Sequence, residues 1–268
     1  IICWYDFMGI LCWWLCKILH KKRSIIALNI LLKNRKSLKN MVARILYKTA
    51  LKSPYLKATV TSKEYGDWVN DLLGIKAKYA LLHDIYHARY NINYQGIIQQ
   101  NSVFCGGRNG RDWKFLLNLA SDMPDVQFNI VLPKDKYEQY KSTFGENVEV
   151  KTEISELDYL QFMCQSAIVL MPLETEAPAG LIAMFQAAAN QKMIITTETV
   201  TTREYFKNNR GILCKNEINK WKEQIRYWLN RPNETIKYAE KFRSFLGREC
   251  SERKFAKNIW HIVTELKT

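Results

Sequence analysis

The sequence has 268 residues, of which 47% are hydrophobic and 12% aromatic; this composition excludes a wholly disordered chain and leaves room for one large or two smaller domains. The formal net charge of +14 is concentrated near the start, because the first 57 residues hold twelve Lys or Arg and a single acid, Asp6. Such asymmetry is typical of a segment that meets an anionic membrane surface, polyphosphate or nucleic acid, or of a basic face that is only solvated. The seven cysteines form no Cys-x-x-Cys pair, which favours reduced thiols in a cytoplasmic protein.

The opening segment, IICWYDFMGILCWWLCKILHKKR, is apolar before it becomes basic, which is the reverse of the order in a signal peptide. Its length approaches that of a membrane-spanning helix, but Asp6 and Lys17 interrupt the apolar run. The remaining interpretation is an amphipathic or buried helix. After it we expect a strand over 24–32, a basic helix over 37–53, a strand over 57–62, a helix ending near Gly74 and a strand over 79–82.

A polar connector over 83–101 precedes a regular alternation of apolar and amphipathic runs. Two of the expected helices open with capping boxes, at Ser155 and at Thr201. Six short apolar strands separated by helices predict an α/β fold with a parallel sheet covered on both faces, and ligands bind such a sheet at the carboxyl ends of its strands. The strands are expected over 102–105, 126–132, 148–151, 167–171, 193–196 and 211–214.

The loop GGRNG, residues 106–110, follows the first of these strands and leads into a helix. Its glycines allow backbone N–H groups to converge on an anion at the positive end of the helix dipole. Arg108 and Arg111 add guanidinium groups suited to phosphate oxygens. The loop is therefore a candidate phosphate cradle, the alternative being an ordinary turn, and its other candidate binding residues are Gly106, Gly107, Asn109 and Gly110.

A second loop, PLETEAPAG, follows the fourth strand of the same sheet and precedes another helix. Glu174 and Glu176 are expected to project toward the crevice that the first loop faces, although either could be a solvated loop residue. The free N–H groups at the start of the helix can hold an anionic or hydroxylated group. Gln186 lies about two turns into this helix, and the residues that begin it are Ala179, Gly180 and Leu181.

The second helix begins with a small residue, Gly and an apolar residue, continues to AAANQK and is followed by an Ile-Ile-Thr strand. This pattern and the two loops resemble the C-terminal half of a GT-B glycosyltransferase, close to family four. The resemblance implies two Rossmann-like domains, each with a parallel sheet. It places a partial N-terminal, acceptor-side domain at 1–90, a linker at 91–100, and the nucleotide-sugar-binding domain with its C-terminal helices at 101–268. The short N-terminal half leads us to expect that the chain lacks its natural start.

The resemblance also implies roles for individual residues. Arg108 matches the arginine of the family's Gly-Arg motif and Arg111 falls where a lysine is usual, so both are expected to neutralise the departing diphosphate. Gly180 and Leu181 match the amides that approach the donor sugar and phosphate. We expect no metal and no cofactor, because arginines and helix amides neutralise the phosphate charge, and the nucleotide-diphosphate sugar is a substrate.

The sequence departs from the family at its pair of glutamates separated by seven residues. Gln186 stands at the second position, which faces the ribose in the family, and Pro178 stands eight residues before it. Glu176 is then expected to replace the first glutamate, with Glu174 behind it. Thr197 and Thr199, just after the fifth strand, are expected to line the same crevice.

The function that follows is transfer of a sugar to a saccharide or lipid-linked acceptor in surface or exopolysaccharide synthesis, on the inner face of a membrane that the basic residues 17–57 contact. A non-catalytic relic of a transferase is a rival interpretation because of Gln186. A nucleic-acid-binding protein would also explain the charge, but the sequence has no zinc-finger, RNP or helix-turn-helix signature, and no nucleic-acid partner is expected.

Overall fold

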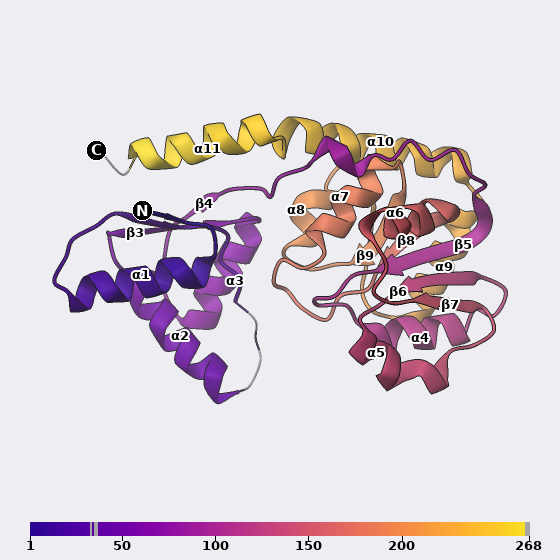
Figure 1. Ribbon diagram of the computed structural model, residues 1–268, viewed down its shortest axis with the longest axis horizontal. Coiled ribbons are helices and arrows are strands. Elements are labelled where there is room, and N and C mark those ends of the chain that lie inside the picture. Colours follow the sequence, from indigo (N-terminus) through magenta and orange to yellow (C-terminus); the bar gives the residue numbers. More distant parts are fainter. Residues whose placement is uncertain (33, 35–36, 266–268) are drawn as a thin grey trace. The chain divides into compact units, whose positions relative to one another are not determined.

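The computed structural model describes residues 1–32, 34 and 37–265. The chain divides into two compact units (Figure 1). Unit 1 comprises Ile1–Ile85, Thr175–Pro178 and Glu249–Thr268, and unit 2 comprises Tyr86–Glu174 and Ala179–Arg248. The boundary after residue 85 lies within the connector expected over 83–101. The C-terminal segment differs from the expectation, because residues from 249 onward group with the first unit.

Unit 1 contains a four-stranded parallel sheet in the order β1-β2-β3-β4. Gly9 of α1 lies so close to β2 that a Cβ there would be 2.5 Å from the Cβ of Ala27, which allows the helix to pack directly on the sheet. The strands are β1 (Ile2–Cys3), β2 (Ile25–Ala27), β3 (Leu56–Val60) and β4 (Tyr79–Leu81), and the helices of its first 85 residues are α1 (Asp6–Ile18), α2 (Leu38–Ala50) and α3 (Lys63–Leu73).

Short polar side chains and one glycine set the ends of these helices. The hydroxyls of Ser37 and Ser62 accept hydrogen bonds from backbone N–H groups in the first turns of α2 and α3. Gly74 ends α3 in the left-handed conformation, with a φ of 60°.

The opening segment differs from its expectation at the first residues, which form the short strand β1 before the helix begins at Asp6. Among the described residues, no helix has the length and apolar character needed to cross a membrane.

The last helix of the described chain, α11 (Glu252–Glu265), packs on the sheet of unit 1 (Figure 1). Ile262 is 3% exposed and joins a buried cluster with Ile26, Leu28 and Leu82. Phe255 packs against the same cluster, which also includes the partly buried Ala80, Ile259 and Val263. Apolar contact therefore explains why this helix belongs to unit 1, although the preceding helix, α10 (Pro232–Glu249), lies almost wholly in unit 2.

Unit 2 contains a six-stranded sheet in the order β10-β9-β8-β5-β6-β7, and every neighbouring pair is parallel. This confirms the parallel α/β fold expected from the alternation. The strands are β5 (Gln99–Gly106), β6 (Gln127–Val131), β7 (Val148–Lys151), β8 (Ser166–Met171), β9 (Met193–Thr197) and β10 (Ile212–Cys214). The remaining elements are the 3-10 helices at Ala88–Tyr90 and Lys141–Thr143 and the helices α4 (Trp113–Ser121), α5 (Lys134–Tyr140), α6 (Glu156–Gln165), α7 (Leu181–Ala189), α8 (Thr202–Phe206) and α9 (Ile218–Leu229).

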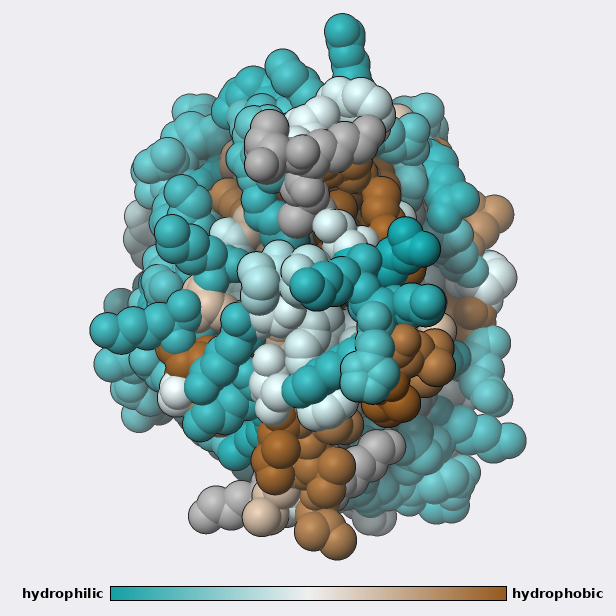
Figure 2. Space-filling model, turned by 90° about the vertical axis from the view of Figure 1, so that its left-hand side faces the viewer, coloured by the Kyte–Doolittle hydropathy of each residue, from teal (hydrophilic) through white to brown (hydrophobic). Residues whose placement is uncertain are grey.

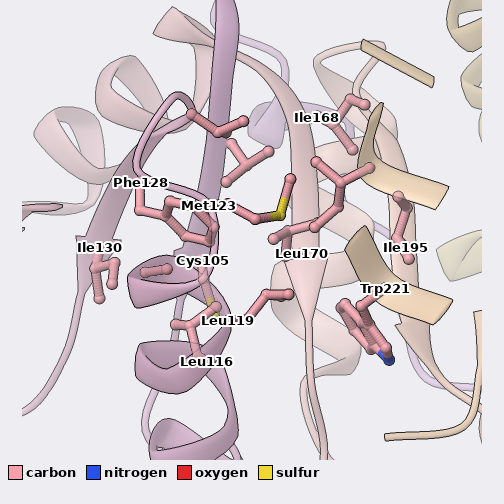
Figure 3. Close-up of a cluster of buried hydrophobic side chains, with 14 of the residues drawn as sticks. Cys105, Leu116, Leu119, Met123, Phe128, Ile130, Ile168, Leu170, Ile195 and Trp221 are labelled. Carbon is pink, nitrogen blue, oxygen red and sulfur yellow. The ribbon is translucent and has the colours of Figure 1, made fainter. Parts of the chain in front are cut away.

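The core of unit 2 lies between one face of this sheet and the helices α4 and α9 (Figure 3). Trp221 of α9 is fully buried and its ring contacts Phe115 of α4. On the opposite face, Phe104 of β5 contacts the rings of Tyr159 and Phe162 from α6. Alternate residues of β5 therefore pack against the helices on opposite faces of the sheet, as a sheet covered on both faces requires.

The two expected capping boxes have different outcomes. The Ser155 hydroxyl accepts a hydrogen bond from the backbone N–H of Asp158 at 3.1 Å and caps α6 as expected. Thr201 precedes α8, but its side chain does not cap the helix. Instead the hydroxyl of Thr199 accepts from the N–H of Thr202 at 3.0 Å, so the capping role moves two residues earlier in the chain.

Candidate active site

The strand order of unit 2 reverses between β5 and β8, because the chain moves outward from β5 through β6 and β7 and then returns to β8 on the other side. In open parallel sheets a crevice outside the carboxyl ends of the strands forms at this switch point and binds ligands. The GGRNG loop follows β5 and the loop that contains Glu174 follows β8. Both candidate loops therefore leave the two strands that flank the switch point.

The two loops are joined to one another by backbone hydrogen bonds. The N–H of Glu174 donates to the carbonyl oxygen of Gly110 at 3.0 Å, and Arg111 forms an isolated antiparallel bridge with Leu173. The N–H of Asp112 donates to the carbonyl oxygen of Pro172 at 3.0 Å. The end of β8 therefore fixes the backbone of the glycine-rich loop.

The two arginines of the first loop have different environments. Arg108 is exposed, as is Asn109 beside it. Arg111 is only 4% exposed, and its Nε donates to the carbonyl oxygen of Gly106 at 3.0 Å. Its Nη1 lies 3.5 Å from the carbonyl oxygen of Asn109. Arg108 thus faces solvent, whereas Arg111 supports the loop from beneath.

Glycines allow this buried guanidinium to fit. Gly107 has a φ of 134°, and a Cβ there would lie 2.8 Å from Nη2 of Arg111. Gly180 has a φ of 77°, and a Cβ there would lie 2.6 Å from Nη1. A Cβ at Gly106 would lie 2.5 Å from the ring of Tyr159. Each glycine is thus required by close contact, and Gly107 and Gly180 are also required by backbone conformation.

The buried groups around Arg111 stay protonated over the ordinary pH range. Burial raises the pKa of the Cys105 thiol to about 12, although the nearby Arg111 charge opposes the shift. Burial also raises the pKa of the Tyr159 hydroxyl, again against the effect of Arg111. The guanidinium is therefore a buried positive charge beside a neutral thiol and a neutral phenol, and neither of these two groups supplies a counter-charge.

The start of α7 presents backbone N–H groups with no side-chain cap. Gly180 occupies the N-cap position, and the first turn holds no acidic residue. The N–H groups of a first helical turn have no acceptor within the helix, and the helix dipole places positive potential there. Ala179 and Leu181, on either side, are buried. This helix end can bind an anionic oxygen.

Asn216, in the loop after β10, connects several of the loops at this edge of the sheet. Its Nδ2 lies 3.0 Å from the carbonyl oxygen of Leu173 and 3.3 Å from Oδ2 of Asp112, which caps α4. Its Oδ1 accepts from the Thr197 hydroxyl at 2.5 Å, and that hydroxyl accepts from the Leu173 N–H at 2.7 Å. The expected binding residue Thr197 is thus part of a network that holds the loops after β5, β8, β9 and β10 together.

The other expected threonine also has internal partners. The hydroxyl of Thr199 accepts from the Thr202 N–H, and the Thr199 N–H donates to the Thr202 hydroxyl at 2.8 Å. Thr199 is 3% exposed. Its side chain shapes the turn between β9 and α8.

Gln186 has a partner that no local pattern indicates. Its side chain is 6% exposed, and its Nε2 donates to Oε1 of Glu156 at 3.2 Å. Glu156 is exposed and lies in the first turn of α6, at the carboxyl edge of the sheet. The pair therefore provides an exposed carboxylate that a buried amide orients, thirty residues away in sequence.

The two glutamates of the second loop fall in different units. Glu174 is exposed, belongs to unit 2 and is held through its backbone by Gly110. Glu176 is partly buried and lies in the segment Thr175–Pro178, which groups with unit 1. In the same segment the N–H of Ala177 donates to the Thr175 hydroxyl at 3.2 Å. Within the described residues, no group of three or more His, Cys, Asp or Glu is placed to hold a metal ion.

Comparison with known proteins identifies the family. A glycosyl transferase-like family matches residues 108–259, which is more than half of the chain. The chain belongs to this glycosyl transferase-like family. A comparison with curated proteins finds no match.

Solved structures show that this glycosyl transferase-like chain has the GT-B fold. It is similar to sucrose-phosphate synthase from Thermosynechococcus elongatus, with a TM-score of 0.79 and 14% identity over 98% of this chain and 72% of that one. It is also similar to HepE from Anabaena in complex with UDP and glucose, with a TM-score of 0.76 and 11% identity over 98% and 77% of the two chains. TarM gives a TM-score of 0.70 at 14% identity, and this chain covers 50% of its length. The chain therefore spans about half of TarM and about three quarters of the other two.

Proposed function

We propose that this protein is a glycosyltransferase that moves a sugar from a nucleotide-sugar donor to a saccharide or lipid-linked acceptor in the synthesis of a surface polysaccharide or exopolysaccharide. One observation carries the proposal: the uncapped start of α7 at Gly180 lies against the buried guanidinium of Arg111, beside the glycine-rich loop at the switch point of the sheet. This arrangement concentrates positive potential where a diphosphate would lie.

In such a transfer the bond between the anomeric carbon and a diphosphate oxygen breaks, a bond to an acceptor hydroxyl oxygen forms, and the proton of that hydroxyl is released to solvent. Negative charge then builds on the departing nucleoside diphosphate. Arg108, which is exposed on the loop, would neutralise this charge directly. Arg111 would act through the electric field and by holding the loop in place, since its side chain is buried beneath it.

Glu156 is the residue that we propose for contact with donor hydroxyl groups. A carboxylate can accept hydrogen bonds from two neighbouring hydroxyls, whereas the amide of Gln186 is buried and already donates to that carboxylate. Gln186 would then orient Glu156. This assignment gives the family's ribose contact to a residue of α6 in place of α7.

UDP is the nucleotide that we propose for the donor. The structures of HepE contain UDP, UDP with glucose, or UDP-glucose, and one structure of TarM contains UDP. Both proteins share the fold of this chain at low identity. The proposal for UDP rests on those relatives, whereas the proposal for a diphosphate rests on the loop and helix end described above.

The test is calorimetric titration of the purified chain with UDP, GDP and their glucose conjugates, together with UMP. We expect UDP to bind and UMP to bind much more weakly, because UMP lacks the second phosphate. Arg108→Ala should weaken UDP binding roughly tenfold to hundredfold, the usual range for one charge-assisted hydrogen bond. Arg226→Ala is the control, because Arg226 is an exposed arginine whose ion pair with Asp125 lies at the amino edge of the sheet.

Equal affinity for UDP and UMP, or an unchanged affinity in Arg108→Ala, would contradict the placement of the diphosphate. A non-catalytic module is the second candidate function, and it is favoured by the neutral Gln186 in place of a carboxylate. That candidate predicts UDP binding without release of UDP from UDP-sugars in the presence of acceptors. Turnover that is lost in Glu156→Gln would favour the enzyme.

A further inference from the structure

An apolar stripe lies exposed along one side of α2 in unit 1. Leu38, Met41, Val42 and Ile45 are 77%, 59%, 50% and 64% exposed. Their spacing of three and four residues places them along one face of the helix. The opposite side of α2 is buried at Tyr47 and Ala50, which are 7% and 0% exposed. We call these four exposed residues the α2 stripe.

The buried side of α2 is firmly attached to unit 1, so the stripe faces outward on a fixed helix. The hydroxyl of Tyr47 donates to Oδ2 of Asp6 at 2.8 Å, and the same carboxylate oxygen accepts from the Leu31 N–H. The indole N–H of Trp14, in α1, donates to the carbonyl oxygen of Leu46 at 3.3 Å. Figure 2 shows hydrophobic side chains on this side of the molecule, including a patch at its lower edge, where α2 lies in Figure 1.

The segment that contains the stripe is rich in positive charge. Residues 17–57 hold twelve Lys or Arg and no Asp or Glu. Lys48 is exposed on the last turn of α2. Lys17 is exposed and its ammonium lies 4.9 Å from the ring centre of Trp14, the residue that is hydrogen-bonded to α2. The exposed bases Lys21, Lys22 and Arg23 follow directly.

We propose that the α2 stripe and its basic surroundings form a docking surface for an anionic lipid bilayer. A helix with an apolar face and a cationic margin lies in the plane of a membrane, with the apolar side chains among the acyl chains and the bases at the headgroups. The excess of bases over acids in residues 17–57 favours an anionic bilayer over an uncharged apolar protein surface, because anionic headgroups attract each base. Docking would place unit 1 at a lipid-linked acceptor, and the surface itself does not depend on the proposed function.

The test is flotation of the full chain with vesicles of phosphatidylcholine alone and of phosphatidylcholine mixed with phosphatidylglycerol, without any nucleotide. We expect binding to the mixed vesicles that weakens as salt is added, and little binding to phosphatidylcholine alone. Ile45→Ser should weaken binding roughly tenfold, since it removes one apolar side chain that would be buried. Lys48→Glu should weaken it by at least about fivefold, the effect of one charge at the surface.

Matched controls are found on α10 of unit 2. Ile236, which is 43% exposed, and the exposed Lys237 beside it allow Ile236→Ser and Lys237→Glu to be made in an equivalent helical setting. Both should bind the mixed vesicles as the unchanged chain does. Thermal unfolding of every variant checks the fold, and Lys48→Glu provides the test if Ile45→Ser destabilises the chain.

Three outcomes would overturn the proposal. Binding that is equal in the α2 variants and the α10 controls would place the docking surface elsewhere. Binding to both kinds of vesicle without any effect of salt would remove the role of the bases. A chain that ignores vesicles but self-associates through the stripe, so that Ile45→Ser lowers its mass in sedimentation, would make a second copy the occupant. Titration with UDP is separate from all three, so failure here leaves the proposed function standing.

Discussion

The guanidinium of Arg111 lies directly against the Cα of Gly180, so that a side chain at position 180 would meet it at 2.6 Å. These residues come from the loop after β5 and from the start of α7, which follows β8. Their contact joins the two strands that flank the switch point. The proposed binding of a diphosphate by the loop and by the helix end therefore depends on one buried side chain.

Substitution of Gly180 tests this contact. Gly180→Ala should lower the free energy of unfolding by roughly 2–4 kcal/mol, because it adds a left-handed alanine and a collision with Arg111 and Met171. Gly247→Ala is the control: Gly247 lies in α10, a methyl group there would have no neighbour within 4 Å, and alanine should raise the free energy of unfolding by about 0.5–1 kcal/mol. Urea unfolding measures both, and equal effects would mean that the contact is not formed in solution.

Arg111→Lys tests the support role of the arginine. Lysine keeps the positive charge but lacks the planar group that donates to the Gly106 carbonyl and fits between Gly107 and Gly180. We expect the free energy of unfolding to fall by about 1–3 kcal/mol. Arg108→Ala, on the exposed side of the same loop, should change it by less than about 0.5 kcal/mol. The reverse order in urea unfolding would exchange the roles of the two arginines.

Gln186→Glu should make stability depend on pH. The new carboxylate would lie at hydrogen-bond distance from Glu156, so one carboxyl of the pair would have its pKa raised in the folded state. The folded chain would then bind more protons than the unfolded chain above about pH 4.3, the ordinary value for Glu. The free energy of unfolding of Gln186→Glu, compared with that of the natural sequence, is therefore retained in acid. It falls as pH rises through the raised pKa.

Thermal unfolding of Gln186→Glu at several pH values measures this effect. Gln191→Glu is the control, because Gln191 is exposed just beyond the same helix. The unfolding midpoints of Gln186→Glu and the natural sequence could differ by the same amount in acid and at neutral pH. That result would show that Glu156 and residue 186 are apart in solution.

Lys192 provides a second pH-dependent contribution, at the opposite edge of the sheet from the candidate site. Burial lowers the pKa of its ammonium to about 8, although Cys164 opposes the shift, and Nζ donates to the Ser166 carbonyl at 2.7 Å. The unfolded chain binds the extra proton between about pH 8 and the ordinary value near 10.4. The free energy of unfolding should therefore rise through this window relative to Lys192→Met. Paired urea titrations at both ends of the window measure the difference, and parallel curves would contradict a buried ammonium.

The order of strands and helices could be predicted from the sequence, because apolar runs of four to eight residues alternate with amphipathic ones. The helix ends marked by Ser37, Ser62, Gly74 and Ser155 are local signals of the same kind. The two-residue strand β1 could not be found, since Ile2 and Cys3 are too few for a pattern. The position of α11 is also beyond local signals, because an amphipathic helix does not show which sheet its apolar side will cover.

The loops that build the candidate site were predictable, but the directions of their side chains were not. The glycines of GGRNG indicate an unusual backbone conformation. The acceptor of the buried Arg111 side chain, however, is a main-chain carbonyl oxygen, and every residue has one. The partner of Gln186 comes from another helix thirty residues earlier. Thr197 meets Asn216 only because the loops after β9 and β10 are adjacent in the folded sheet. Such pairs depend on tertiary contact, which periodicity does not encode.

The attachment of α11 to unit 1 has a consequence for synthesis of the protein. Ile26, Leu28 and Leu82 are translated before unit 2, whereas Ile262, which covers them, is translated after it. Unit 1 therefore cannot complete its core while most of unit 2 is still being translated. During that interval the nascent chain carries an uncovered apolar sheet face, the kind of surface that chaperones bind and that promotes aggregation.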